Sequence, residues 1–122
     1  AGMIYNGFSA KARAEGAKVE YAYPKEGFVV WMDNVVLLKD APNRDNALKF
    51  MNFLLVPENA AAVTNYAAYT SGVLGVEPFL DDAIKNSPEN NPPAGATPGV
   101  FAQACDAETQ KLYDAIWTNL KK

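Results

Sequence analysis

The most apolar stretch of the chain is residues 28–38. It reads Phe-Val-Val-Trp-Met-Asp-Asn-Val-Val-Leu-Leu and is rich in β-branched and aromatic residues. Such a composition is typical of a strand covered on both faces, so a strand is expected here. Two shorter strands are expected at residues 2–5 and, from its alternating pattern, at residues 19–23. The sequence Pro-Lys-Glu-Gly at 24–27 predicts a turn between the second and third strands.

Apolar residues that recur at helical spacing predict helices along the rest of the chain. Gly16 is well placed to end the first helix, and Pro57 to end one helix and begin the next. Asn43 or Asp45 can cap the second helix. In chain order, the expected helices lie at about residues 9–15, 46–56, 58–67, 78–85 and 106–120.

Two further segments have the composition of loops. Residues 69–75 carry two glycines, and residues 87–99 contain four prolines among asparagines and glycines. Because proline donates no backbone hydrogen bond, we expect the second segment to be an irregular crossing on the surface. Strands that alternate with helices indicate an α/β fold with a partly parallel sheet.

Composition and charge narrow the classes of function. The 122 residues suffice for one ordinary domain, and 49% hydrophobic with 20% charged residues fits a globular chain. The net charge of −3 argues against a nucleic-acid partner. The chain has no histidine and one cysteine, Cys105, so histidine-dependent catalysis and a multi-thiolate zinc site are excluded. We therefore expect no enzymatic activity, no metal and no cofactor.

Asp33 is the most unusual residue of the predicted strand at 28–38. On a strand it shares a face with Trp31, because side chains two positions apart point the same way. A carboxylate on an apolar face is costly unless a cation, backbone donors or a cationic ligand compensates its charge. Trp31 adds the aromatic face that cations prefer. Together the two residues offer what an ammonium group needs.

The same pattern also has a structural interpretation. Strand carboxylates frequently pair with an internal arginine, and Arg13 and Arg44 are the only arginines. Either one at Asp33 would favour a structural or partner-docking domain, with Trp31 as plain core. A set of tyrosines can likewise form core edges or the walls of a cleft: Tyr5, Tyr23, Tyr66 and Tyr69.

The motif Pro-Lys-Glu-Gly at 24–27, followed by Trp-Met-Asp at 31–33, resembles the periplasmic polyamine-binding proteins of bacterial ABC importers. The spermidine/putrescine-binding members are the most similar. The resemblance includes Tyr-Asn-Gly at 5–7 and the helix pair at 46–58, as well as the proline-rich passage and the aromatic C-terminal helix. It covers nearly the whole chain but corresponds to the last third of such a protein.

The resemblance implies a solute-binding fold of two α/β lobes that close over a ligand like a hinged trap. Residues 1–31 and 78–122 would then belong to the second lobe, and residues 32–77 to the first lobe. The chain would be a C-terminal fragment with parts of both lobes. The start of the chain, which reads as a strand already in progress, is also expected of a fragment.

The resemblance further implies ligand-binding roles for five residues. Asp33 would pair with a polyamine ammonium, and Trp31 would line the methylene chain. Tyr5 occupies a position where the family usually has tryptophan, so the preferred amine stays open. Tyr69 matches a ligand-lining tyrosine after the second helix, and Gln103 matches by spacing a glutamine before the C-terminal helix. With the resemblance, Asp33 is expected to face a ligand rather than an internal arginine.

The implied function is capture of putrescine- or spermidine-like cations in the periplasm and delivery to the permease subunits of an ABC importer. The fragment alone should expose apolar surface and associate with itself or with a companion chain. It should bind amines weakly, because the other lobe supplies further carboxylates and aromatic residues.

Overall fold

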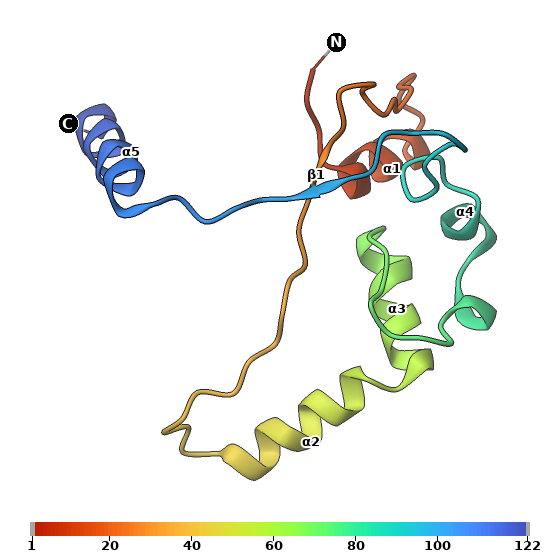
Figure 1. Cartoon of the computed structure of the whole chain (residues 1–122). Coiled ribbons are helices and arrows are strands. Elements are labelled where there is room, and N and C mark those ends of the chain that lie inside the picture. The colour runs from red at the N-terminus through yellow and green to blue at the C-terminus, as the bar shows by residue number, and fades with distance from the viewer. Residues whose placement is uncertain (1, 122) are drawn as a thin grey trace.

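The computed structural model of the chain describes residues 2–121. Most of its regular structure is helical, with one short parallel sheet (Figure 1). In chain order the elements are α1 (Asn6–Ala14), β1 (Val29–Val30), α2 (Arg44–Leu54), α3 (Pro57–Ala67), the 3₁₀ helix η1 (Glu77–Phe79), α4 (Asp82–Lys85), β2 (Val100–Phe101) and α5 (Ala107–Leu120).

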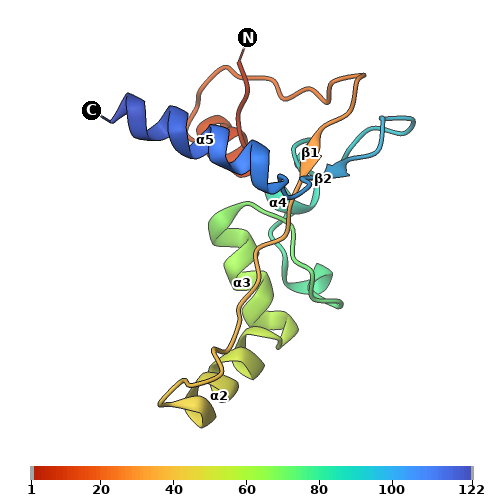
Figure 2. The ribbon, with the colours of Figure 1, turned by 60° about the vertical axis from the view of Figure 1, so that its left-hand side comes forward.

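Two long extended segments give the molecule an open shape. One connects β1 to α2 and the other connects β2 to α5, which lies away from the other helices in Figure 1. After α3 the chain returns through η1 and α4 toward α1 and then to the sheet (Figures 1 and 2). Segments from the beginning and the end of the chain therefore meet at β1 and β2.

The sheet consists of β1 and β2, which pair in parallel with Val29 opposite Val100. The amide of Val100 donates to the carbonyl of Phe28 at 2.9 Å, and the amide of Ala102 donates to that of Val30 at 3.3 Å. A Cβ at Gly99 would fall 2.5 Å from the Val30 side chain, so glycine is required where the strands approach. The expected parallel pairing is confirmed, in a sheet of two short strands.

The predicted strands are largely absent from residues 2–121. Residues 2–5 and 19–23 form no strand, and the long strand expected at 28–38 is reduced to β1. A strand needs a neighbour that accepts and donates its backbone hydrogen bonds. Residues 31–38 have no such neighbour among the described residues and run as an exposed, extended segment. The strand predictions at 2–5 and 19–23 are wrong, and the one at 28–38 holds only for Val29 and Val30.

Four of the five helix predictions, at 9–15, 46–56, 58–67 and 106–120, are confirmed with small shifts of their ends. Helix α1 begins three residues earlier than expected, and Gly16 follows it with φ of 91°, a conformation that favours glycine. Helix α2 begins after Asn43, whose side chain makes no capping hydrogen bond. Pro57 is the first residue of α3, which ends in a left-handed Ala68 with φ of 64°.

Helix α5 begins directly after Asp106, which caps its N-terminus. The Asp106 carboxylate accepts a hydrogen bond from the Thr109 amide at 2.8 Å. Hydrogen bonds to this backbone amide and to the Thr109 side chain hold the pKa of Asp106 below its ordinary value. The cap therefore depends on an ionised side chain.

Two expectations between α3 and β2 need correction. The helix expected at 78–85 is split into η1 and α4, with Leu80 and Asp81 extended between them. Residues 87–99 are irregular as expected, but they do not all lie on the surface. Ser87 and Glu89 are each only 2% exposed, and Glu89 contacts Ser9 and Arg13 of α1.

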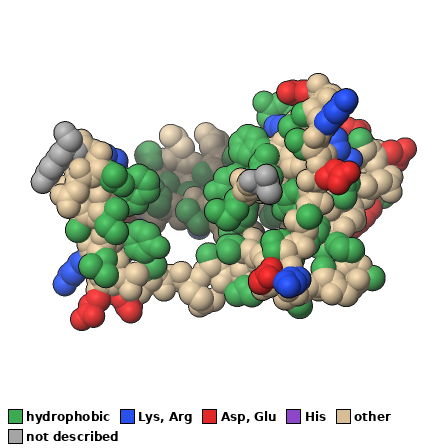
Figure 3. Space-filling view, turned by 90° about the horizontal axis from the view of Figure 1, so that it is seen from above, with side chains coloured by type: hydrophobic (Ala, Val, Ile, Leu, Met, Phe, Trp, Pro, Cys, Tyr) green, Lys and Arg blue, Asp and Glu red, His purple; other side chains and the backbone are tan. Residues whose placement is uncertain are grey.

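The buried apolar core is small and lies where α3 meets η1. It consists of Ala60, Ala61 and Val76, with Val73 and Leu80 packed against them. Hydrophobic side chains remain open over much of the surface (Figure 3). The apolar face predicted for α5 is more than half exposed at every position: Leu112, Tyr113, Ile116, Trp117 and Leu120.

No helix within residues 2–121 combines the length and the apolar character needed to cross a bilayer.

Candidate functional site

Tyr5 and Trp31 form an aromatic corner where the start of α1 meets the end of β1. Their ring centroids lie 5.1 Å apart, with the ring planes at 66° in an edge-on contact. Phe8, one turn into α1, adds a third ring at 6.2 Å from Tyr5. Tyr5 is 57% and Trp31 47% exposed, so neither belongs to the core. The pair presents aromatic surface that a ligand can cover.

An open depression of about 410 Å³ borders this corner. It is lined by Val30, Trp31, Met32, Asn34, Phe101 and Ala102. The residues of the lining come from the carboxyl ends of β1 and β2 and from the segments that follow them. In parallel sheets, ligands bind beyond the carboxyl ends of the strands, so this depression lies where a ligand is expected.

Asp33 lies in the exposed segment that follows β1, two residues beyond Trp31. Within residues 2–121 it makes no ion pair. Arg13 pairs with Glu89, and Arg44 makes no ion pair among the described residues. The internal arginine that the structural interpretation requires is therefore not at Asp33. The Asp33 carboxylate is exposed to solvent.

Gln103 follows β2 by two residues, in the chain segment beside the one that carries Trp31. Its side-chain amide donates to the Phe101 carbonyl at 3.2 Å, and the residue is exposed. The parallel pairing thus brings the segments of Gln103, Trp31 and Asp33 to one end of the sheet. The side chain of Gln103 is occupied locally rather than by the other two residues.

Tyr69 follows the end of α3 and lies against the start of α1. A Cβ at Gly7 would fall 2.7 Å from the Tyr69 ring and 2.9 Å from the Ala67 carbonyl oxygen. Glycine at position 7 is therefore what lets the Tyr69 ring lie against the first turn of α1. The structure thus places Tyr69 beside the helix that begins after Tyr5, although the two residues are far apart in sequence.

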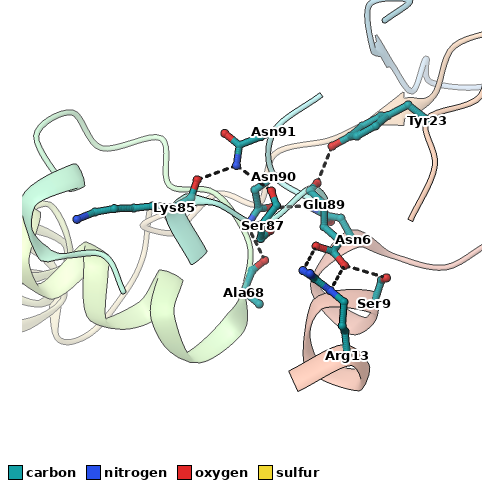
Figure 4. A network of polar contacts seen from close by, with 10 residues as sticks. All are labelled: Asn6, Ser9, Arg13, Tyr23, Ala68, Lys85, Ser87, Glu89, Asn90 and Asn91. Atoms are coloured by element: carbon teal, nitrogen blue, oxygen red, sulfur yellow. Dashed lines mark hydrogen bonds and ion pairs between the residues drawn. The ribbon is translucent and has the colours of Figure 1, made fainter. Parts of the chain in front are cut away.

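A polar cluster around the buried Glu89 connects α1 with residues 87–91 (Figure 4). The Glu89 carboxylate accepts from Arg13 at 2.6 and 3.2 Å and from the Ser9 hydroxyl at 3.2 Å. The Tyr23 hydroxyl donates to the Glu89 carbonyl at 2.6 Å. These contacts join α1, the segment before the turn at 24–27 and residues 87–91 in one network.

Burial raises the pKa of Tyr21 and Tyr23, and the negative charge of Glu89 adds to this effect. For Tyr23, the neighbouring Tyr21 also contributes. The two tyrosine rings contact each other edge-on at 5.2 Å. Both hydroxyls therefore stay protonated, and that of Tyr23 stays a donor to the Glu89 carbonyl, well above neutral pH.

The sequence pattern did not indicate Glu89 or Asn90, and it suggested Asp33 rather than Glu89 as the partner of Arg13. The segment at 87–91 has the composition of a loop, and Glu89 pairs with a residue 76 positions away. No local pattern encodes such a contact. The single clue is the scarcity of arginine, since one of only two arginines lies on the short helix at 6–14.

The arrangement suits a ligand that is both cationic and apolar. An exposed carboxylate without an internal partner attracts an ammonium group, and aromatic faces stabilise both the cation and an adjoining hydrocarbon chain. Residues 2–121 contain no cluster of three or more acidic or cysteine side chains that suits a metal ion.

Comparison with known proteins gives the family. Residues 2–92 match the bacterial extracellular solute-binding proteins. The chain belongs to this family. The match includes the aromatic corner, the segment that carries Asp33, helices α2 and α3, and the buried cluster around Glu89.

Several curated relatives are similar along most of the chain. The putrescine-binding periplasmic protein SpuD of Pseudomonas aeruginosa is 36% identical over 119 residues, or 93% of this chain and 32% of that protein. The spermidine/putrescine-binding periplasmic proteins of Salmonella typhimurium and Escherichia coli are each 31% identical over 98% of this chain and 34% of their own length. The chain therefore spans about a third of the length of these solute-binding relatives.

Proposed function

We propose that the full-length protein containing this chain captures a linear polyamine, such as putrescine or spermidine. The observation that carries the proposal is an exposed Asp33 that makes no ion pair among the described residues and follows Trp31 of the aromatic corner by two positions in the chain. Relatives that bind these amines, aligned over nearly the whole chain, support the same ligand class. Asp33 is proposed to pair with an ammonium group of the ligand.

The energetics of such a ligand fit the residues present. A polyamine consists of methylene groups between ammonium groups, and burial against aromatic rings stabilises it by about 0.8 kcal/mol per methylene. A cation over an aromatic face adds about 1 kcal/mol when water is excluded. Tyr5, Trp31 and Tyr69 are proposed as the aromatic walls, and Gln103 as a polar contact after β2. The open depression supplies only part of such a site.

The proposal includes a second set of ligand contacts, which come from parts of the full-length protein outside the 122 residues of this chain. In it, residues 1–31 and 78–122 belong to the second of two lobes and residues 32–77 to the first. The extended segment after β1 is then one crossing between the lobes. The distance between α2 and the sheet in Figure 1 is consistent with this division. Closure of the two lobes would cover the depression and exclude water from Asp33.

The site is proposed to bind its ligand without chemical conversion, in the periplasm, and to deliver it to the permease of an ABC importer. The names of the relatives describe periplasmic binding proteins, which supports this location. The chain has no histidine, and its conspicuous carboxylate faces solvent rather than a buried acid–base partner. Turnover of an amine by the purified protein would contradict the proposal.

The experiment is calorimetric titration of the full-length protein with putrescine, spermidine and arginine. The wild-type protein is expected to bind at least one polyamine, and Asp33→Asn is expected to bind it much more weakly. Asp40→Asn is the matched control, because Asp40 lies exposed in the turn that ends the same segment. No heat of binding with any polyamine would refute the function, whereas equal affinity of the wild type and Asp33→Asn would refute the role of Asp33.

A further inference from the structure

The side chain of Asn90 connects two segments that are distant in sequence. Its Oδ1 accepts a hydrogen bond from Asn6 Nδ2 at 2.9 Å, and its Nδ2 donates to the Ala68 carbonyl at 3.2 Å (Figure 4). The first contact spans 84 positions and the second spans 22. Asn90 thus bridges the start of α1 and the residue that ends α3.

Each bridged residue is next to an aromatic residue of the candidate site. Asn6 follows Tyr5, which lies at the N-terminus of α1 and whose carbonyl accepts from the Ser9 amide at 3.1 Å. Ala68 precedes Tyr69 and is held in the left-handed conformation, with 3% of its surface exposed. The bridge therefore connects the residue that follows Tyr5 with the residue that precedes Tyr69.

Asn90 is itself held in place by its neighbours. The adjacent Glu89 is 2% exposed, and Arg13, Ser9 and Tyr23 all donate hydrogen bonds to it. On the other side, the Asn91 amide donates to the carbonyls of Lys85 and Ser87, both at 2.8 Å. The segment is thus anchored on both sides of the bridge. An anchored bridge can fix the position of what it touches.

We propose that Asn90 is a positioning residue for ligand binding, which holds Tyr5 and Tyr69 at the spacing that a bound amine requires. The inference rests on the proposed polyamine function for its effect on affinity. Asn90 touches no ligand in this account. It acts through the Asn6 side chain and the Ala68 carbonyl, and the Asn90 amide is suited to this because it donates and accepts at once. Aspartate would keep the acceptor and lose the donor.

The test compares Asn90→Ala and Asn90→Asp with Asn91→Ala in the full-length protein. Asn91→Ala is the matched control, because it removes two hydrogen bonds from the same segment but none that reaches α1 or α3. Loss of the bridge is expected to weaken polyamine binding about fivefold or more in Asn90→Ala. Asn91→Ala is expected to keep the wild-type affinity. Equal losses in both variants, or no loss in Asn90→Ala, would overturn the proposal.

Two further measurements distinguish an effect of Asn90 on the position of the tyrosine rings from a general loss of folded structure. In a Tyr69→Ala background, Asn90→Ala is expected to cost less affinity than in the wild type, because the ring that it positions is gone. An unchanged cost in that background and in Tyr5→Ala would contradict positioning.

The second readout needs no ligand. With fluorotyrosine in place of tyrosine, ¹⁹F spectra of the unliganded protein are expected to show shifted Tyr5 and Tyr69 signals in Asn90→Ala and unshifted ones in Asn91→Ala. Unshifted signals in Asn90→Ala would refute the inference. If the wild type binds no amine, the proposed function fails while this spectroscopic comparison still decides the role of Asn90.

Discussion

Glu89 is the residue on which the contact between α1 and residues 87–91 depends. Its buried carboxylate accepts hydrogen bonds from Arg13 and Ser9. The Arg13 side chain is 43% exposed, so water screens part of this attraction. Removing the charge nevertheless leaves buried donors with a weaker acceptor. The energetic weight of the cluster therefore falls on the carboxylate rather than on the arginine.

Glu89→Gln is predicted to lower the free energy of unfolding by about 1–3 kcal/mol. The glutamine retains one acceptor for Ser9 but loses the charge that faces Arg13. Urea unfolding of the full-length protein measures the change. Asp82→Asn is the control, because the Asp82 carboxylate lies 4.0 Å from Lys85 and is 94% exposed. Equal effects of the two substitutions would contradict the structural role given to Glu89.

At the scale of elements, the helices could be predicted from the sequence because their signals are local. Pro57 begins α3, Asp106 caps α5, and Gly16 follows α1 in a conformation that suits glycine. The extent of the strands could not be predicted from the sequence, because strand pairing depends on a partner far along the chain. The apolar residues at 28–38 predict a strand, yet only Val29 and Val30 pair with a neighbouring strand. The apolar composition of residues 28–38 therefore predicts a longer strand than the two paired residues that the structure contains.

In the candidate site, too, some residues are visible in the sequence and others depend on contacts between distant segments. Trp31 and Asp33 could be singled out because a carboxylate within an apolar run is visible in the sequence. Their placement with Tyr5, Tyr69 and Gln103 as ligand contacts stays a prediction. The bridge through Asn90 could not be foreseen, because it depends on how α1, α3 and a loop meet in space.

Helix α5 is predicted to depend on pH through its cap. The pKa of Asp106 lies below its ordinary value of 3.8, so the ionised cap stabilises the helix above that pH. The stabilisation is lost as the pH falls through the lowered pKa. NMR titration of the Asp106 carboxyl group is expected to give a midpoint below 3.8. Asp106→Asn should keep the helix without this dependence, whereas Asp106→Ala should fray its first turn. A midpoint at or above 3.8 would contradict the capping role.

At the scale of the whole molecule, exposed apolar surface is the main feature of the isolated chain. The apolar face of α5 and the segment at 31–38 are open, and the buried core is confined to a few residues near α3. Such surface favours association with another chain or with further parts of the same protein. The relatives, three times as long, supply candidates for those further parts.

The isolated 122-residue chain is therefore predicted to self-associate, or to bind a companion chain that covers its apolar surface. Light scattering across a range of protein concentrations measures the mass. A dimer or larger species is expected. Trp117→Glu places a charge in the open apolar face of α5 and should reduce the association. Lys111→Glu changes a charge on the same helix but removes no apolar contact, so it should not reduce the association in this way. A monomer at all concentrations would contradict the prediction.

Recognition of a polyamine by Asp33 is the central claim, and calorimetric titration of putrescine and spermidine into the full-length protein tests it most directly. A charge-assisted hydrogen bond contributes about 2 kcal/mol, so Asp33→Asn is predicted to weaken binding about 30-fold relative to the wild type. Asp40→Asn is predicted to bind as the wild type does. Wild-type affinity in Asp33→Asn, or the same loss in both variants, would contradict the account.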